Sequence, residues 1–100
     1  MNLNDRITNK FEELANGVKE IQVTKVEYIY EVNRREWQQW STSVLNLFNM
    51  VFGLDSVQYK NFKKIYDEFN YTDYSLDSAT GVFLLLKLIM KGVTYSPFRQ

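Results

Sequence analysis

Apolar residues recur every three or four positions along the first twenty residues of the chain. The series consists of Leu3, Ile7, Phe11, Leu14, Val18 and Ile21. This spacing places them on one face of an α-helix, and Asn4 or Asp5 can cap its start. Gly17 either ends this helix or lies inside it. Because the apolar series continues through Val18, we expect the helix to reach about Lys19.

The next stretch changes to a period of two. Apolar or aromatic and polar positions alternate in Val26, Glu27, Tyr28, Ile29, Tyr30, Glu31 and Val32. This is the period of a half-buried β-strand, and the β-branched and aromatic content agrees. No second alternating run of similar quality follows, so such a strand would lack a partner. We therefore expect a short extended segment over residues 22–32 that crosses between helices, with a helical extension of the next element as the alternative.

The strongest helical pattern runs from about Asn33 to Phe52. Asn33 is a suitable N-cap, Glu36 follows three residues later as in a capping box, and Gly53 is a suitable stop. One apolar face is formed by Trp37, Trp40, Val44, Leu47, Phe48 and Val51. Leu45 lies off that face, which predicts that this helix packs on two sides.

A third helix is predicted to follow closely. Asp55 and Ser56 offer a cap, and the helix extends to about Phe69. Its expected buried face consists of Tyr59, Phe62, Ile65, Tyr66 and Phe69. The lysines of this segment lie opposite that face and are balanced by nearby acidic residues, which is typical of a solvated surface.

The last predicted helix spans about residues 76–91, after an ordered loop at residues 70–75. Asp77 or Ser78 is its expected cap and Gly92 its expected stop. Between residues 82 and 90 the only polar residue is Lys87. A helix that is apolar on nearly every side must be surrounded, and a bundle of four encloses one helix only partly. We therefore expect its outer face to contact something else.

These elements predict an all-α fold, a small bundle of about four helices formed by one domain over residues 1–100. The 45% hydrophobic and 24% charged residues fit a globular chain. Twelve basic and twelve acidic residues give zero formal charge, which argues against a nucleic-acid partner. The chain has no signal-peptide pattern and no apolar run of the roughly 20 residues that span a bilayer. We expect a soluble, cytoplasmic protein that does not bind membranes.

The residues needed for most catalytic and metal sites are missing from the sequence. It contains no Cys and no His, so disulfides, thiolate nucleophiles, structural zinc sites and imidazole acid–base chemistry are excluded. Its four glycines are isolated, so no phosphate-binding loop can form. Ser41, Thr42 and Ser43 lack any base beyond Lys or a carboxylate, and small polar packing is their simpler role. We expect no enzymatic activity, no cofactor and no metal.

Aromatic residues make up 16% of the chain, which is high for a core of this size. Tyr and Trp are enriched where proteins meet partners, although small cores also use large side chains. The expected partner-binding residues are Trp37, Tyr28, Tyr30, Phe83, Leu86 and Met90. For Trp37 and its neighbour Trp40, core packing of one or both is the favoured interpretation, and a partner-binding anchor at Trp37 is the functional one.

Residues 40–56, with the sequence WSTSVLNLFNMVFGLDS, followed by Tyr59 and Phe62, resemble a recurring pattern. They are similar to the N-terminal helical domains of bacterial abortive-infection and related antiphage-defence proteins, as are residues 79–92. The resemblance implies a helical module, normally followed by an effector domain and credited with association or sensing. It transfers no catalytic residue, and the matching positions at Trp40 and at residues 52–56 look structural.

Three hypotheses follow for the function of the chain. The first is a non-catalytic interaction and oligomerisation module of an antiphage-defence protein, which forms a homo-oligomer or contacts an effector through its last helix. The second is a small stand-alone inhibitor or decoy, phage-encoded in one version, that binds a host or defence enzyme. The third is a sensor with a ligand pocket between aromatic helices.

Overall fold

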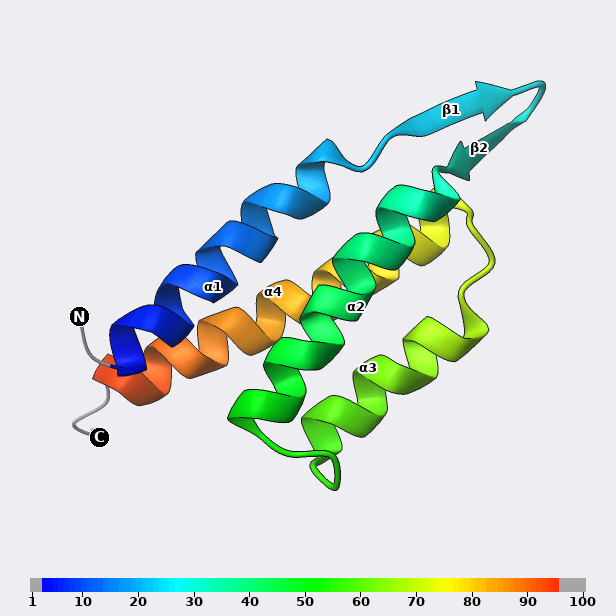
Figure 1. The fold of residues 1–100 in the computed structure, drawn as a ribbon. Coiled ribbons are helices and arrows are strands. Elements are labelled where there is room, and N and C mark those ends of the chain that lie inside the picture. The colour runs from blue at the N-terminus through cyan, green and yellow to red at the C-terminus, as the bar shows by residue number, and fades with distance from the viewer. Residues whose placement is uncertain (1–2, 96–100) are drawn as a thin grey trace.

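The computed structural model describes the backbone of residues 3–95 and the side chains of residues 5–87. Its elements are α1 (Leu3–Gly17), a 3₁₀ turn η1 (Val18–Glu20), β1 (Val23–Val26), β2 (Ile29–Val32), α2 (Arg34–Val51), α3 (Val57–Glu68) and α4 (Asp73–Tyr95). The four predicted helices are confirmed. The expected all-α class is corrected to a mostly helical fold with one small antiparallel sheet, which projects beyond the helices in Figure 1.

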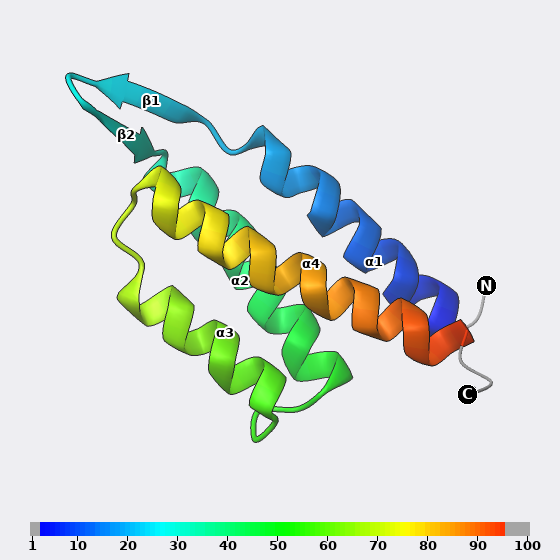
Figure 2. The ribbon, with the colours of Figure 1, turned by 180° about the vertical axis from the view of Figure 1, so that it is seen from behind.

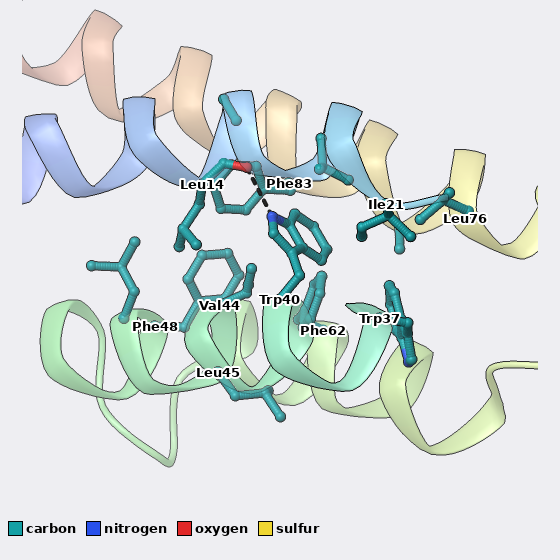
Figure 3. Close-up of a cluster of buried hydrophobic side chains, with 14 of the residues drawn as sticks. Leu14, Ile21, Trp37, Trp40, Val44, Leu45, Phe48, Phe62, Leu76 and Phe83 are labelled. Atoms are coloured by element: carbon teal, nitrogen blue, oxygen red, sulfur yellow. Dashed lines mark hydrogen bonds between the residues drawn. The ribbon is translucent and has the colours of Figure 1, made fainter. Parts of the chain in front are cut away.

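The helices enclose a core made largely of aromatic rings. α2 packs between α1 and α3, and α4 covers the opposite side of the core, as the view from behind shows (Figure 2). Trp40, Phe48, Phe62 and Phe83 meet at the centre, each no more than 6% exposed (Figure 3). These large side chains supply the apolar burial that a domain of this size needs.

The end of α1 is tied to α2 by a buried hydrogen bond. Trp40 Nε1 donates to the carbonyl oxygen of Leu14 over 2.8 Å (Figure 3). The indole N–H is buried and finds its acceptor here, so the bond allows Trp40 to be enclosed in the core without an unpaired donor. The chain then continues through Gly17 into η1, and Val18 and Ile21 are buried. The expected continuation to about Lys19 is confirmed, although its last turn is a 3₁₀ helix.

Gly17 offers a stabilising substitution. Its φ of −64° and ψ of −33° are helical. A Cβ there would lie 3.6 Å from Trp40 Cδ1, an ordinary contact. Gly17→Ala should therefore raise the free energy of unfolding by about 0.5–1 kcal/mol, because alanine loses less backbone entropy. Gly53→Ala is the matched control and should destabilise, because Gly53 has a φ of +94°. Urea denaturation checks both signs, and a loss of stability in Gly17→Ala would contradict the helical assignment.

Local caps fix both ends of α2 and the start of α3. Asn33 Oδ1 accepts from the Glu36 backbone N–H at 3.0 Å, which confirms the predicted cap. The Glu36 carboxylate does not return to Asn33, as a capping box requires; it accepts from the Gln22 N–H at 2.7 Å. Gly53 ends α2 in the left-handed region, and Ser56 Oγ accepts from the Tyr59 N–H at 3.0 Å.

The bounds predicted for the last helix are wrong at both ends. α4 begins at Asp73, three residues before the expected start, because Thr72 Oγ1 accepts from the Ser75 N–H at 3.2 Å and caps it. Asn70 Oδ1 accepts in turn from Thr72 Oγ1 at 2.7 Å. At the other end the backbone stays helical through Gly92 to Tyr95. Glycine in a helix costs only about 1 kcal/mol relative to alanine, so it does not force a stop.

The segment of residues 22–32 is extended, as expected, but it folds back on itself. β1 and β2 pair antiparallel with Val23 opposite Val32 and Val26 opposite Ile29. The expectation of a strand without a partner is therefore wrong. Glu27 and Tyr28 form the two-residue turn, with Glu27 at a φ of +57°. The half-buried pattern is also wrong, because only Val32 of these eight strand residues is buried.

Candidate interaction surface

The predicted contact residues divide into exposed and buried positions. Tyr28 is 96% exposed at the tip of the β1–β2 hairpin, and Tyr30 on β2 is 44% exposed. Trp37 and Phe83 are 1% and 0% exposed, so the expectation that they contact a partner is corrected. The Trp37 ring stacks on Phe69 with 3.6 Å between centroids, and Phe83 packs against three other rings. Both side chains serve the core.

The outer face of α4 is only partly apolar where its side chains are described. Leu86 is half-buried against the core, and the side chain of Met90 lies outside the described residues. The exposed apolar side chains of this face are instead those of Leu84 and Leu85, which are 39% and 58% exposed and were not among the expected contact residues. Towards the start of the helix, Asp77, Ser78 and Gly81 are exposed and interrupt this face. These positions do not form a continuous apolar patch.

The hairpin is the main group of exposed apolar side chains at one end of the molecule. Its exposed apolar and aromatic residues are Val23, Val26, Tyr28, Ile29 and Tyr30. Val26 and Ile29 face each other across the strands and are 46% and 59% exposed. The other face carries the Lys25–Tyr30 pair, in which the ammonium nitrogen lies 5.9 Å from the ring centroid. Helices cover neither face of the outer part of the hairpin (Figures 1 and 2).

The base of the hairpin is anchored firmly to the bundle. The Val32 N–H donates to the Tyr71 carbonyl oxygen at 2.8 Å, and Glu31 forms a β-bridge with Thr72. Next to it, the Asn33 N–H donates to the Gln22 carbonyl oxygen at 2.9 Å. The Arg34 guanidinium lies 4.0 Å from the centroid of the Tyr71 ring, a cation–π contact. The hairpin is therefore a projecting element with a fixed base.

Ser41 and the Lys63–Asp67 pair show how polar side chains of the described residues are used. Among residues 5–87, no three or more Asp or Glu side chains gather as a metal site. Ser41 is fully buried and its Oγ donates to the Trp37 carbonyl oxygen at 2.7 Å, so it is a packing residue of α2. The pKa of Lys63 is raised, first by its hydrogen bond to the Asp67 carboxylate at 2.7 Å. This pair is an exposed contact one turn apart on α3.

A groove of about 420 Å³ lies between α1 and α2. Its lining consists of Arg6, Ile7, Lys10, Ser43, Asn46, Leu47 and Met50. No aromatic ring contributes to this groove, whereas Trp40 lines a second hollow of about 330 Å³ beside Gly17 and Glu36. The central aromatic rings instead pack on one another, with Phe48 and Phe83 stacked at 6.1 Å.

None of the described helices is long and apolar enough to cross a membrane. Comparison of the chain with protein-family models, with curated proteins and with solved structures finds no match.

Proposed function

We propose that this domain is a non-catalytic protein-interaction module and that the β1–β2 hairpin is its contact element. The observation that carries the proposal is the exposure of this hairpin, which holds five large apolar or aromatic side chains outside the core. Aromatic and β-branched side chains at a projecting tip bury large areas when a partner covers them. The setting in antiphage defence rests on the resemblance of residues 40–56.

Two physical features support contact over a purely structural role. A two-stranded hairpin is marginally stable by itself in water, and a third strand or a cover stabilises it. The turn also places Glu27 at a φ of +57°, where glycine or asparagine is usual. Glu27 and Tyr28 occupy this turn although neither residue type favours it. A contact role for the tip accounts for residues that turn stability does not favour.

A photocrosslinking experiment tests the proposal. A benzoyl-phenylalanine placed at Tyr28 should give discrete protein adducts in bacterial cells, because its side chain is 96% exposed at the tip. The same probe at Leu54, which is 57% exposed in the turn between α2 and α3, is the matched control and should give none. Absence of adducts at Tyr28, or equal adducts at both positions, would refute the hairpin as the contact element.

The Val26→Ser, Ile29→Ser double variant should separate binding from folding. Both side chains are about half exposed, so the free energy of unfolding should change by less than about 1 kcal/mol. The adducts formed by the Tyr28 probe should nevertheless decrease strongly, since the apolar contact is lost. Urea denaturation followed by circular dichroism measures the free energy of unfolding, and gel analysis measures the yield of crosslinked adducts. A destabilisation of several kcal/mol would show that the hairpin belongs to the core.

A further inference from the structure

We infer that the partner of the hairpin is a second copy of this chain, paired through the free edge of β1. In this arrangement the two β1 strands run antiparallel, Thr24 faces Thr24 of the second copy across a twofold axis, and the hairpins form a four-stranded sheet. The inference rests on the proposed function and names the partner for the same surface.

The hydrogen bonds at the base of the hairpin show which backbone groups point outward. The Asn33 N–H donates to the Gln22 carbonyl oxygen, so these two residues face each other. The Val32 N–H donates away from β1, to Tyr71. Because groups alternate along an antiparallel pair, Val23 and Lys25 direct their N–H and C=O groups away from β2. The outer edge of β1 therefore presents two donors and two acceptors.

The two hairpin edges differ: the β1 edge is open along its whole length, whereas the β2 edge is occupied at its base. On the β2 side, Glu31 already pairs with Thr72 at the base of the sheet. On the β1 side, no backbone hydrogen bond within residues 3–95 joins residues 23–26 to any segment other than β2. Such an edge is a template for a further strand. β1 is thus the edge where a third strand adds.

Because outward backbone groups occur at every second residue of β1, two β1 strands can pair antiparallel about a twofold axis in three registers. Two of these registers are unfavourable. An axis at Lys25 sets two ammonium groups directly opposite each other, which is destabilising. An axis at Val23 pairs Lys25 with Ile21 of the second copy, but Ile21 is only 8% exposed within the bundle. An axis at Thr24 pairs residues 22–26 with residues 26–22 of the second copy. It uses all of β1 and places Val23 opposite Lys25.

The Thr24 register also satisfies the backbone and the side chains. The outward groups of Val23 exchange hydrogen bonds with those of Lys25 in the second copy, so all four edge groups are paired on each strand. Thr24 meets Thr24, a favourable cross-strand pair. Each Lys25 stays beside its own Tyr30 ring and covers Val23 of the second copy with its alkyl stem.

Symmetry and charge favour a second copy over an unrelated peptide. The edge is self-complementary, as an isologous twofold interface requires. A formal charge of zero means that two copies do not repel each other at long range. The hairpin projects along the long axis of a molecule of 50 × 27 × 25 Å (Figure 1). In the antiparallel arrangement the two bundles then lie towards opposite ends of the joint sheet.

A single cysteine at the proposed axis is the most direct test. The chain contains no cysteine, so Thr24→Cys introduces one thiol. Opposed residues of a pair that does not exchange hydrogen bonds lie about 4.5 Å apart at Cα, within the range of a disulfide. Under mild oxidation, Thr24→Cys should form a covalent dimer at least about tenfold faster than Tyr28→Cys, although Tyr28 is more exposed. Equal rates would overturn the proposed register.

Sedimentation of the unmodified 100-residue chain tests the association itself. Wild-type protein should show a monomer–dimer equilibrium in the micromolar range, as expected for a small interface. Thr24→Lys should weaken it by at least about tenfold, because two lysines meet at the axis, while opposite Glu31 it adds a favourable pair within the hairpin. Lys25→Pro should weaken it similarly by removing an outward N–H that the monomer does not use.

The failure of this inference is distinguishable from the failure of the proposed function. A strict monomer at several hundred micromolar would overturn self-pairing. If the Tyr28 probe then captures a different protein, the hairpin remains a contact element with another occupant. If wild-type dimerises but Thr24→Lys and Lys25→Pro dimerise equally well, the dimer uses another face and the inference is also overturned.

Discussion

Trp40→Ala is expected to lower the free energy of unfolding by about 3–5 kcal/mol, which is a large part of the stability of a domain of this size. The Trp40 ring is 6% exposed and lies 5.5 Å from Phe83 and 6.0 Å from Phe62, measured between centroids. Removal of the indole leaves a large cavity among α1, α2, α3 and α4. It also leaves the Leu14 carbonyl oxygen without its 2.8 Å donor.

Trp40→Phe separates these two contributions. Phenylalanine fills most of the space but has no N–H, so the hydrogen bond to the Leu14 carbonyl oxygen is lost at a cost of about 0.5–1.5 kcal/mol. Urea denaturation followed by circular dichroism gives both free energies, and the order should be wild type, Trp40→Phe, then Trp40→Ala. A cost below about 1 kcal/mol for Trp40→Ala would show that the ring is not in the core.

Helix ends were predictable where one side chain makes the decisive hydrogen bond. The caps at Asn33 and Ser56 and the stop at Gly53 agree with the sequence, because each cap bonds three positions along the chain and the stop depends on the backbone freedom of Gly53 itself. The capping-box role expected for the Glu36 carboxylate is wrong because its hydrogen-bond partner is distant in the sequence. Its acceptor site is used by Gln22, fourteen residues away, and no local rule includes that partner.

The hairpin was missed because its turn carries none of the usual signals. Two-residue turns favour Asn-Gly, Asp-Gly or Gly at their first position, and here the pair is Glu27–Tyr28. Without a turn signal, the alternating pattern of residues 26–32 predicts one continuous extended segment. The start of α4 was missed similarly, since the cap depends on the side chains of Asn70, Thr72 and Ser75 bonding to one another.

The sequence showed which residues are apolar but not which are covered. Phe83 and Leu85 are two positions apart on α4, and one is 0% and the other 58% exposed. The nearly all-apolar pattern from residue 82 to residue 90 does not show which side of the helix faces the core, because hydrophobic residues occur on every side. The same limit applies to Tyr28 and Trp37: both are aromatic, and the sequence does not distinguish the exposed ring of Tyr28 from the buried ring of Trp37.

Phe83→Ala and Leu85→Ala should therefore differ strongly. The Phe83 ring contacts Phe11, Trp40 and Phe48 with centroids 5.5–6.1 Å apart, so it joins α4 to α1 and α2. Its truncation should cost about 3–5 kcal/mol. Leu85→Ala removes a side chain that is largely in water and should change the free energy of unfolding by less than about 1 kcal/mol.

Measuring the stability of these variants at several protein concentrations also shows which surface forms the dimer interface. If α4 is an interface in solution, Leu85 is buried there, and Leu85→Ala becomes costly as the protein concentration rises. If copies pair through β1, the cost of Leu85→Ala stays small at every concentration, whereas Thr24→Lys becomes costly as wild-type dimer accumulates. Urea midpoints at a few and at several hundred micromolar protein distinguish these cases. A concentration-dependent cost at Leu85 alone would move the interface from the hairpin to the last helix.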